Sequence, residues 1–82
     1  MNRDTRAFRG KVIEQYGTIG NFADAMNWSG RKASYVTTGR QDMTAEEIEK
    51  SAEALHVDNV NDFMRIFYPF LSIKWTKREK GA

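Results

Sequence analysis

The residues best suited to chemistry lie between positions 29 and 40, where hydroxyl, guanidinium, ammonium and phenol groups follow one another at helical spacing. They are Ser29, Arg31, Lys32, Ser34, Tyr35, Thr38 and Arg40. Arginine pairs in a bidentate manner with guanine, while lysines, hydroxyls and backbone N–H groups bind phosphate. This set therefore contains the kinds of groups that proteins use to contact nucleic acid. The alternative is that these charges are ordinary solvated residues of a helix surface.

The residue types that catalysis needs are sparse. His56 is the single histidine and cysteine is absent, so the chain offers no Cys/His metal set and no thiolate nucleophile. Gly17 and Gly20 are too far apart and too few to form a phosphate-binding loop. We interpret His56 as a loop or half-buried structural residue. We predict that the protein is not an enzyme and uses no metal or cofactor.

The segment from Thr18 to Arg40 has the pattern of two short helices joined by a tight turn. Such a unit needs a small residue where the helices cross, a turn residue that tolerates positive φ, inward apolar residues and a terminating glycine. These determinants are Ala23, Asn27, Ala33, Val36 and Gly39. Thr18 and Ser29 are the expected N-caps. The offsets predict a helix-turn-helix whose second helix, at about residues 30–38, enters the major groove.

Three further helices are expected around this unit. Apolar residues at helical spacing predict one helix from Phe8 to Tyr16, which Asp4 or Thr5 opens and Gly17 ends. The sequence Thr44-Ala45-Glu46-Glu47 is a capping box and predicts another helix. A last helix is expected to begin at Asp58 and to end at Pro69, since proline disfavours helix in the residue before it. Its predicted inward residues are Val60, Phe63, Met64 and Phe67.

The pattern changes after Pro69. Leu71, Ile73 and Trp75 alternate with polar residues, which predicts a short extended strand. The charged residues from Thr76 to Ala82 lack apolar anchors and are predicted to be disordered. We therefore expect an all-α fold with five helices over residues 1–69, followed by an extended C-terminal arm and basic tail over residues 70–82.

Charge is unevenly distributed along the 82 residues, a length that fits one domain. Residues 1–41 carry a net charge of +4, residues 42–67 carry −5, and residues 68–82 carry +3. A surface with separate basic and acidic sides favours a polyanionic partner on one side only. No apolar run is long enough to span a bilayer, so we expect a soluble cytoplasmic protein with no membrane partner.

The segment from Thr18 to Arg40, with flanking helices from about Phe8 to Phe67, resembles the Cro/repressor-type (XRE-like) helix-turn-helix family of phages and bacteria. The sequences RGKVIEQYG and NFADAM are similar to small regulators of temperate phages, which include Cro-like proteins and modulators of repression. The resemblance implies a lambda-repressor-like fold, a double-stranded DNA operator, a homodimer and a bacterial host cell. By the same resemblance, Ser29 contacts phosphate, Arg31, Lys32, Ser34 and Tyr35 face the groove, and Arg40 lies by the DNA backbone.

Three residues depart from the family pattern. Asn27 replaces the usual turn glycine, which the fold tolerates. The other two departures remove DNA contacts. Ile19 stands where a polar phosphate anchor is frequent, and Gly30 stands where a base-contacting side chain is usual. These departures favour an alternative function, in which the same scaffold binds a phage repressor protein as an antirepressor or modulator. The candidate partner-binding residues are Trp28, Arg31, Tyr35, Phe70, Leu71, Ile73 and Trp75. Trp28 has a second interpretation, as a buried anchor between helices.

Overall fold

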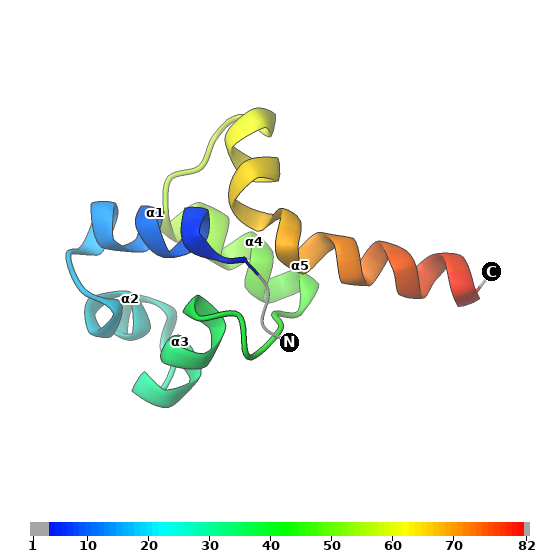
Figure 1. The fold of residues 1–82 in the computed structure, drawn as a ribbon. Coiled ribbons are helices and arrows are strands. Elements are labelled where there is room, and N and C mark those ends of the chain that lie inside the picture. Colours follow the sequence, from blue (N-terminus) through cyan, green and yellow to red (C-terminus); the bar gives the residue numbers. More distant parts are fainter. Residues whose placement is uncertain (1–3, 82) are drawn as a thin grey trace.

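In the computed structural model, the regular secondary structure of the described backbone, residues 4–81, consists of helices alone (Figure 1). The helices are α1 (Arg6–Tyr16), α2 (Ile19–Met26), α3 (Gly30–Thr37), α4 (Ala45–Ala54) and α5 (Val60–Gly81). Side chains are described for residues 4–71. The all-α prediction is confirmed. None of the helices in this part of the chain is long and apolar enough to cross a membrane.

The predicted helix caps of the central unit are present. The Thr18 hydroxyl accepts a hydrogen bond from the Asn21 N–H at 3.1 Å, and α2 ends at Asn27 in the left-handed region, with φ of 61°. The Ser29 hydroxyl accepts from the Lys32 N–H at 3.1 Å and starts α3. Because each bond satisfies a backbone donor that the helix leaves unpaired, the short helices begin and end where the sequence predicts.

The core is organised around the ring of Phe8 in α1. This ring makes edge-to-face contacts with Phe22 of α2 and with Phe67 and Phe70 of α5, at centroid distances of 5.9, 5.6 and 5.5 Å. All four rings are fully buried. Edge-to-face aromatic pairs contribute beyond their buried area. Phe8 therefore joins the first, second and last helices in one cluster.

A buried hydrogen bond fixes the end of α3 against the start of α1. The Thr5 hydroxyl donates to the Thr37 carbonyl oxygen at 2.7 Å, and both residues are buried. Thr5 is the N-cap residue of α1, but its side chain makes no capping bond. Since the two residues are far apart in the sequence, this bond holds the tertiary position of α3 and not a local turn.

The C-terminal part of the chain differs from the prediction. Helix α5 continues through Pro69, so the strand predicted for residues 70–75 is wrong. The backbone of the residues expected to form a disordered tail continues this helix as far as Gly81, and it extends away from the other helices (Figure 1). Proline removes one helical hydrogen bond and its ring crowds a carbonyl of the preceding turn, but continued helix places Phe70 in the core against Phe8. Burial of that ring offsets the local preference of proline.

The start and the inward face of α5 also differ. Asn59, not Asp58, accepts a hydrogen bond from the Asp62 N–H at 2.8 Å and caps the helix. Val60 is 75% exposed and Met64 is 41% exposed, although both were predicted to face inward. Phe67 is buried and Phe63 is half-buried, as predicted, and the other buried positions are Ile66 and Phe70. Inclusion of Phe70 in the helix moves the buried face toward these residues.

Candidate nucleic-acid interface

Helix α3 has one inward face and one open face. Ala33, Val36 and Thr37 are buried against the rest of the protein. Most of the predicted DNA-binding residues are exposed on the other face or next to it. They are Ser29, Arg31, Ser34, Tyr35, Thr38 and Arg40. A single helix therefore displays a guanidinium, hydroxyls and a phenol to solvent, which are groups that contact base edges and phosphates.

The N-terminal end of α3 is open. Ser29 caps the helix and stays exposed, and a Cβ added at Gly30 would meet nothing within 4 Å. The first N–H groups of a helix have no carbonyl partner in that helix, and the helix dipole favours an anion there. The end of α3 can therefore bind a phosphate through the Ser29 hydroxyl and the adjacent backbone.

The C-terminal end of α3 presents Thr38 and Arg40 differently. The Thr38 hydroxyl donates to the Ser34 carbonyl oxygen at 2.8 Å, so its proton is used within the helix. The Arg40 N–H donates to the Tyr35 carbonyl oxygen at 2.8 Å, and its side chain is exposed just after Gly39. Arg40 is thus the better of the two for a phosphate contact.

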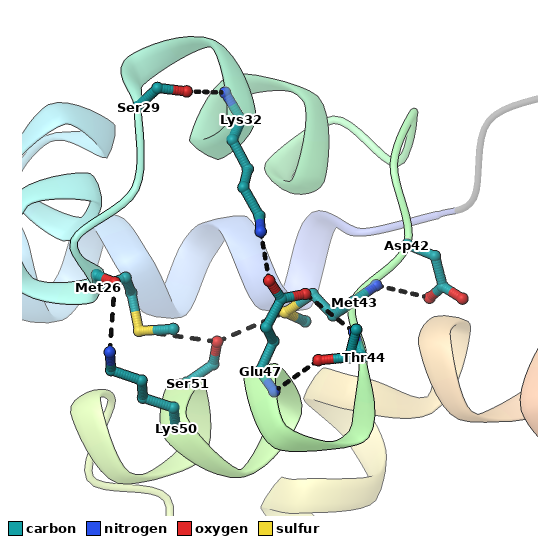
Figure 2. A network of polar contacts seen from close by, with 9 residues as sticks. All are labelled: Met26, Ser29, Lys32, Asp42, Met43, Thr44, Glu47, Lys50 and Ser51. Carbon is teal, nitrogen blue, oxygen red and sulfur yellow. Dashed lines mark hydrogen bonds and ion pairs between the residues drawn. The ribbon is translucent and has the colours of Figure 1, made fainter.

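The Lys32 side chain lies toward α4, contrary to the prediction that it faces the same way as Arg31. Its ammonium forms an ion pair with Glu47 of α4 (Figure 2). The same ammonium lies 5.0 Å from the centre of the Trp28 ring. The Lys32 side chain is 30% exposed. Both the carboxylate of Glu47 and the face of the Trp28 ring attract the ammonium. Adjacent cations on α3 therefore have different environments, and Arg31 alone of the pair is open.

Glu47 serves two partners at once. One carboxylate oxygen accepts from the Thr44 N–H at 2.9 Å and completes the capping box of α4, while the other pairs with Lys32. Burial on its own would raise the pKa of Glu47, but the hydrogen bonds from Lys32 and Thr44 and the charge of Lys32 lower it overall. Glu47 is therefore ionised at neutral pH. Its role at this site was missed in the sequence, although a capping-box carboxylate keeps a second oxygen for a cation.

Trp28 is a half-buried anchor and not an exposed apolar residue. Its ring makes an edge-to-face contact with Phe22, at a centroid distance of 5.8 Å and an interplanar angle of 86°. It packs against the hydrophobic core together with Ile19. Ile19 and Trp28 are thus both used for packing.

The C-terminal partner-binding candidates do not form an exposed cluster in the described residues. Phe70 is fully buried and Leu71 is half-buried against the core, so the proposal of Phe70 as a surface residue is corrected. The side chains of Ile73 and Trp75 lie outside the described residues. A different apolar surface on α5 is exposed, formed by Val60, Met64 and Tyr68. The spacing of four residues could have indicated this exposed row in the sequence, but Val60 and Met64 were predicted to face the core.

The structure gives no support for metal binding at His56. This residue has φ of 58° and donates its N–H to the Glu53 carbonyl oxygen at 3.1 Å at the end of α4. Within the described residues no group of three or more His, Cys, Asp or Glu side chains could hold a metal ion. His56 therefore terminates a helix in the position where glycine or asparagine is common.

The basic residues near α1 differ in whether they already form an ion pair within the protein. Arg6 forms an exposed ion pair with Asp4 at 2.9 Å. The side-chain hydrogen bond from Arg6 is the main cause that lowers the pKa of Asp4 to about 2. Arg9 is exposed, and Arg3 lies outside the described residues.

The fold and the open face of α3 define a small all-α protein with a helix-turn-helix-like arrangement. Residues 1–69 match the family described as protein of unknown function (DUF739), and the chain belongs to that family. No curated protein matches the chain.

Proposed function

We propose that the protein is a sequence-specific DNA-binding regulator of a phage-type lysogeny switch, active in the cytoplasm of a bacterial host. The observation that carries this proposal is the open face of α3. There Arg31, Ser34 and Tyr35 are exposed side by side next to an uncovered helix N-terminus. Helix-turn-helix proteins place such a face in the major groove of an operator.

Each exposed group has a distinct proposed role. Arg31 pairs with a guanine, and a bidentate pair of this kind contributes about 1–3 kcal/mol of discrimination between bases. Ser29 and Arg40, at opposite ends of α3, bind phosphates and fix the orientation of the helix. Ser34 and Tyr35 contact base edges or sugar beside Arg31.

A homodimer fits this function, because two copies of α3 can occupy two half-sites of a palindromic operator. The exposed residues Val60, Met64 and Tyr68 follow one another at intervals of four along α5. Large apolar side chains in a row on one helix are suited to pairing with another helix. We propose that a second copy of this chain covers this row.

The test is a binding titration with duplex DNA from the control region that the regulator serves, followed by selection from a random duplex library. Arg31→Ala is expected to lower affinity and to relax the preference for guanine at one position. Arg9→Ala removes the same charge from the exposed surface of α1 and should leave base preference unchanged. Absence of binding by the unaltered protein at low salt would rule out the proposal.

A second function is favoured by two observations. Ile19 packs against the core where a phosphate anchor is frequent, and Gly30 has no side chain at the open end of α3. The alternative is an antirepressor that binds a repressor protein encoded nearby. Co-purification with that repressor, weakened by Arg31→Ala or Tyr35→Ala but not by Arg9→Ala, would support this alternative.

A further inference from the structure

Lys32, Glu47 and Trp28 form a mixed ionic and aromatic cluster between α3 and α4. The Lys32 ammonium pairs with a Glu47 oxygen on one side and lies 5.0 Å from the centre of the Trp28 ring on another. The side chains of Lys32 and Glu47 are 30% and 22% exposed. Figure 2 shows the Lys32 side chain running from α3 toward α4, where it meets the carboxylate.

The position of Glu47 is fixed by its own helix. The Thr44 N–H holds one carboxylate oxygen at 2.9 Å, and the Glu47 N–H donates to the Thr44 hydroxyl at 3.1 Å. The side chain therefore has little freedom to follow Lys32 if the ammonium moves outward. Transfer of Lys32 to a DNA phosphate would leave a partly buried carboxylate without its cation, which is unfavourable.

We propose that Glu47 is a positioning residue that withholds Lys32 from DNA phosphates and thereby limits the charge that α3 presents to DNA. This inference rests on the proposed DNA-binding function. Arg31 and Arg40 are then the cations of the α3 region that meet DNA, while Lys32 joins α3 to α4.

The consequence concerns specificity. Each cation that neutralises a phosphate strengthens binding to every DNA sequence and steepens the salt dependence by about 0.9 in the slope of log K against log salt. Withholding one cation lowers sequence-independent affinity while base contacts from Arg31 stay in place. The ratio of specific to non-specific binding therefore rises.

The experiment compares Glu47→Gln with Glu49→Gln in titrations of a non-cognate duplex at several salt concentrations. Glutamine also serves in a capping box, so α4 keeps its start, and both substitutions remove the same charge from the same helix. Glu49 is exposed and outside the cluster. For Glu47→Gln we expect a slope steeper by about 0.9, so a fourfold rise in salt weakens binding about 3.5-fold more than in the unaltered protein.

Substitutions of the lysine complete the test. Lys32→Met keeps an unbranched apolar stem against Trp28 and should leave the slope unchanged, whereas Arg40→Met, which removes a proposed phosphate contact, should flatten it by about 0.9. Combining Lys32→Met with Glu47→Gln should restore the original slope. The inference is overturned if Glu47→Gln and Glu49→Gln give equal slopes, or if Lys32→Met flattens the slope as much as Arg40→Met.

Failure of this inference can be told apart from failure of DNA binding. If the unaltered protein binds no duplex at low salt, the proposed function fails, and a role in withholding Lys32 from DNA falls with it. The cluster is then still testable by the NMR signal of the Trp28 indole N–H. That signal should shift in Glu47→Gln and stay in place in Glu49→Gln, and its constancy in both would rule out the cluster in solution.

Discussion

At the scale of single residues, Arg31 and Lys32 show how neighbouring cations acquire different roles. Both follow the Ser29 cap, and the sequence alone suggests that they act together. Successive helix residues point about 100° apart, so only one of them lies over α4. There Glu47 and Trp28 hold Lys32, while Arg31 stays open. The partner that decides this is fifteen positions away, beyond the range of a local pattern.

The paired Glu47 should make stability depend on acidity. Its pKa in the folded protein is below the ordinary value of 4.5, so its contribution is complete above that pH and is lost as pH falls through the folded pKa. Glu47→Gln lacks this contribution. The difference in unfolding free energy between the unaltered protein and Glu47→Gln should therefore be largest at neutral pH and shrink below about pH 4.5. Urea unfolding at several pH values measures it, and a constant difference would contradict the pKa assignment.

Thr5 is expected to be a major single-residue contributor to the placement of α3. Thr5→Val preserves shape but leaves the Thr37 carbonyl oxygen without its buried donor, which should cost about 1–3 kcal/mol of unfolding free energy. Thr38→Val is the control, because Thr38 is exposed and its hydroxyl bonds within its own helix. Denaturant unfolding gives both values. Equal losses in the two variants would show that the bond to Thr37 has no special weight.

At the scale of the elements, helix boundaries that depend on local chemistry were predictable. Ser29, Asn27 and the capping box at Thr44 act through neighbouring backbone groups. Residue types and spacing are therefore enough to predict where these helices begin and end. The continuation of α5 through Pro69 was not predictable in this way. It depends on Phe70 reaching the ring of Phe8 in α1, a contact that no local rule contains.

Two glycines in and after α1 differ in backbone conformation, so replacing them with alanine should have opposite effects on stability. Gly10 lies within α1 with open space where an alanine methyl group would lie, so Gly10→Ala should stabilise the protein by about 0.5–1 kcal/mol. Gly17 ends α1 with φ of 81°, so Gly17→Ala should destabilise it by about 1–2 kcal/mol. Thermal unfolding of both variants checks the signs. Stabilisation by Gly17→Ala would mean that α1 ends in another conformation.

At the scale of the whole molecule, charge is distributed unevenly among the helices. The sequence divides it into a basic first half and an acidic middle, and α4 carries exposed Glu46, Glu49 and Glu53 while α3 exposes Arg31. Such a division should turn the α3 side toward a polyanion and the α4 side away from it. The uneven charge can be read from the sequence, as can the exposed residues of α3 other than Lys32. The sequence did not predict the Lys32–Glu47 pair or the apolar row on α5, because both depend on how helices far apart in sequence lie together.

The apolar row on α5 should determine the number of copies in the DNA complex. Tyr68 is 57% exposed, so Tyr68→Lys should leave the fold intact while placing a charge in the proposed contact between two copies. Sedimentation velocity is expected to show a shift from dimer to monomer, together with loss of tight binding to a full palindrome and retained weak binding to a half-site. Gln15→Lys adds the same charge on the exposed surface of α1 and should change neither property.

A monomeric unaltered protein that binds one half-site as tightly as two would instead show that α5 is not a contact between copies. Dimerisation that survives Tyr68→Lys and Met64→Lys together would place the contact elsewhere on the molecule.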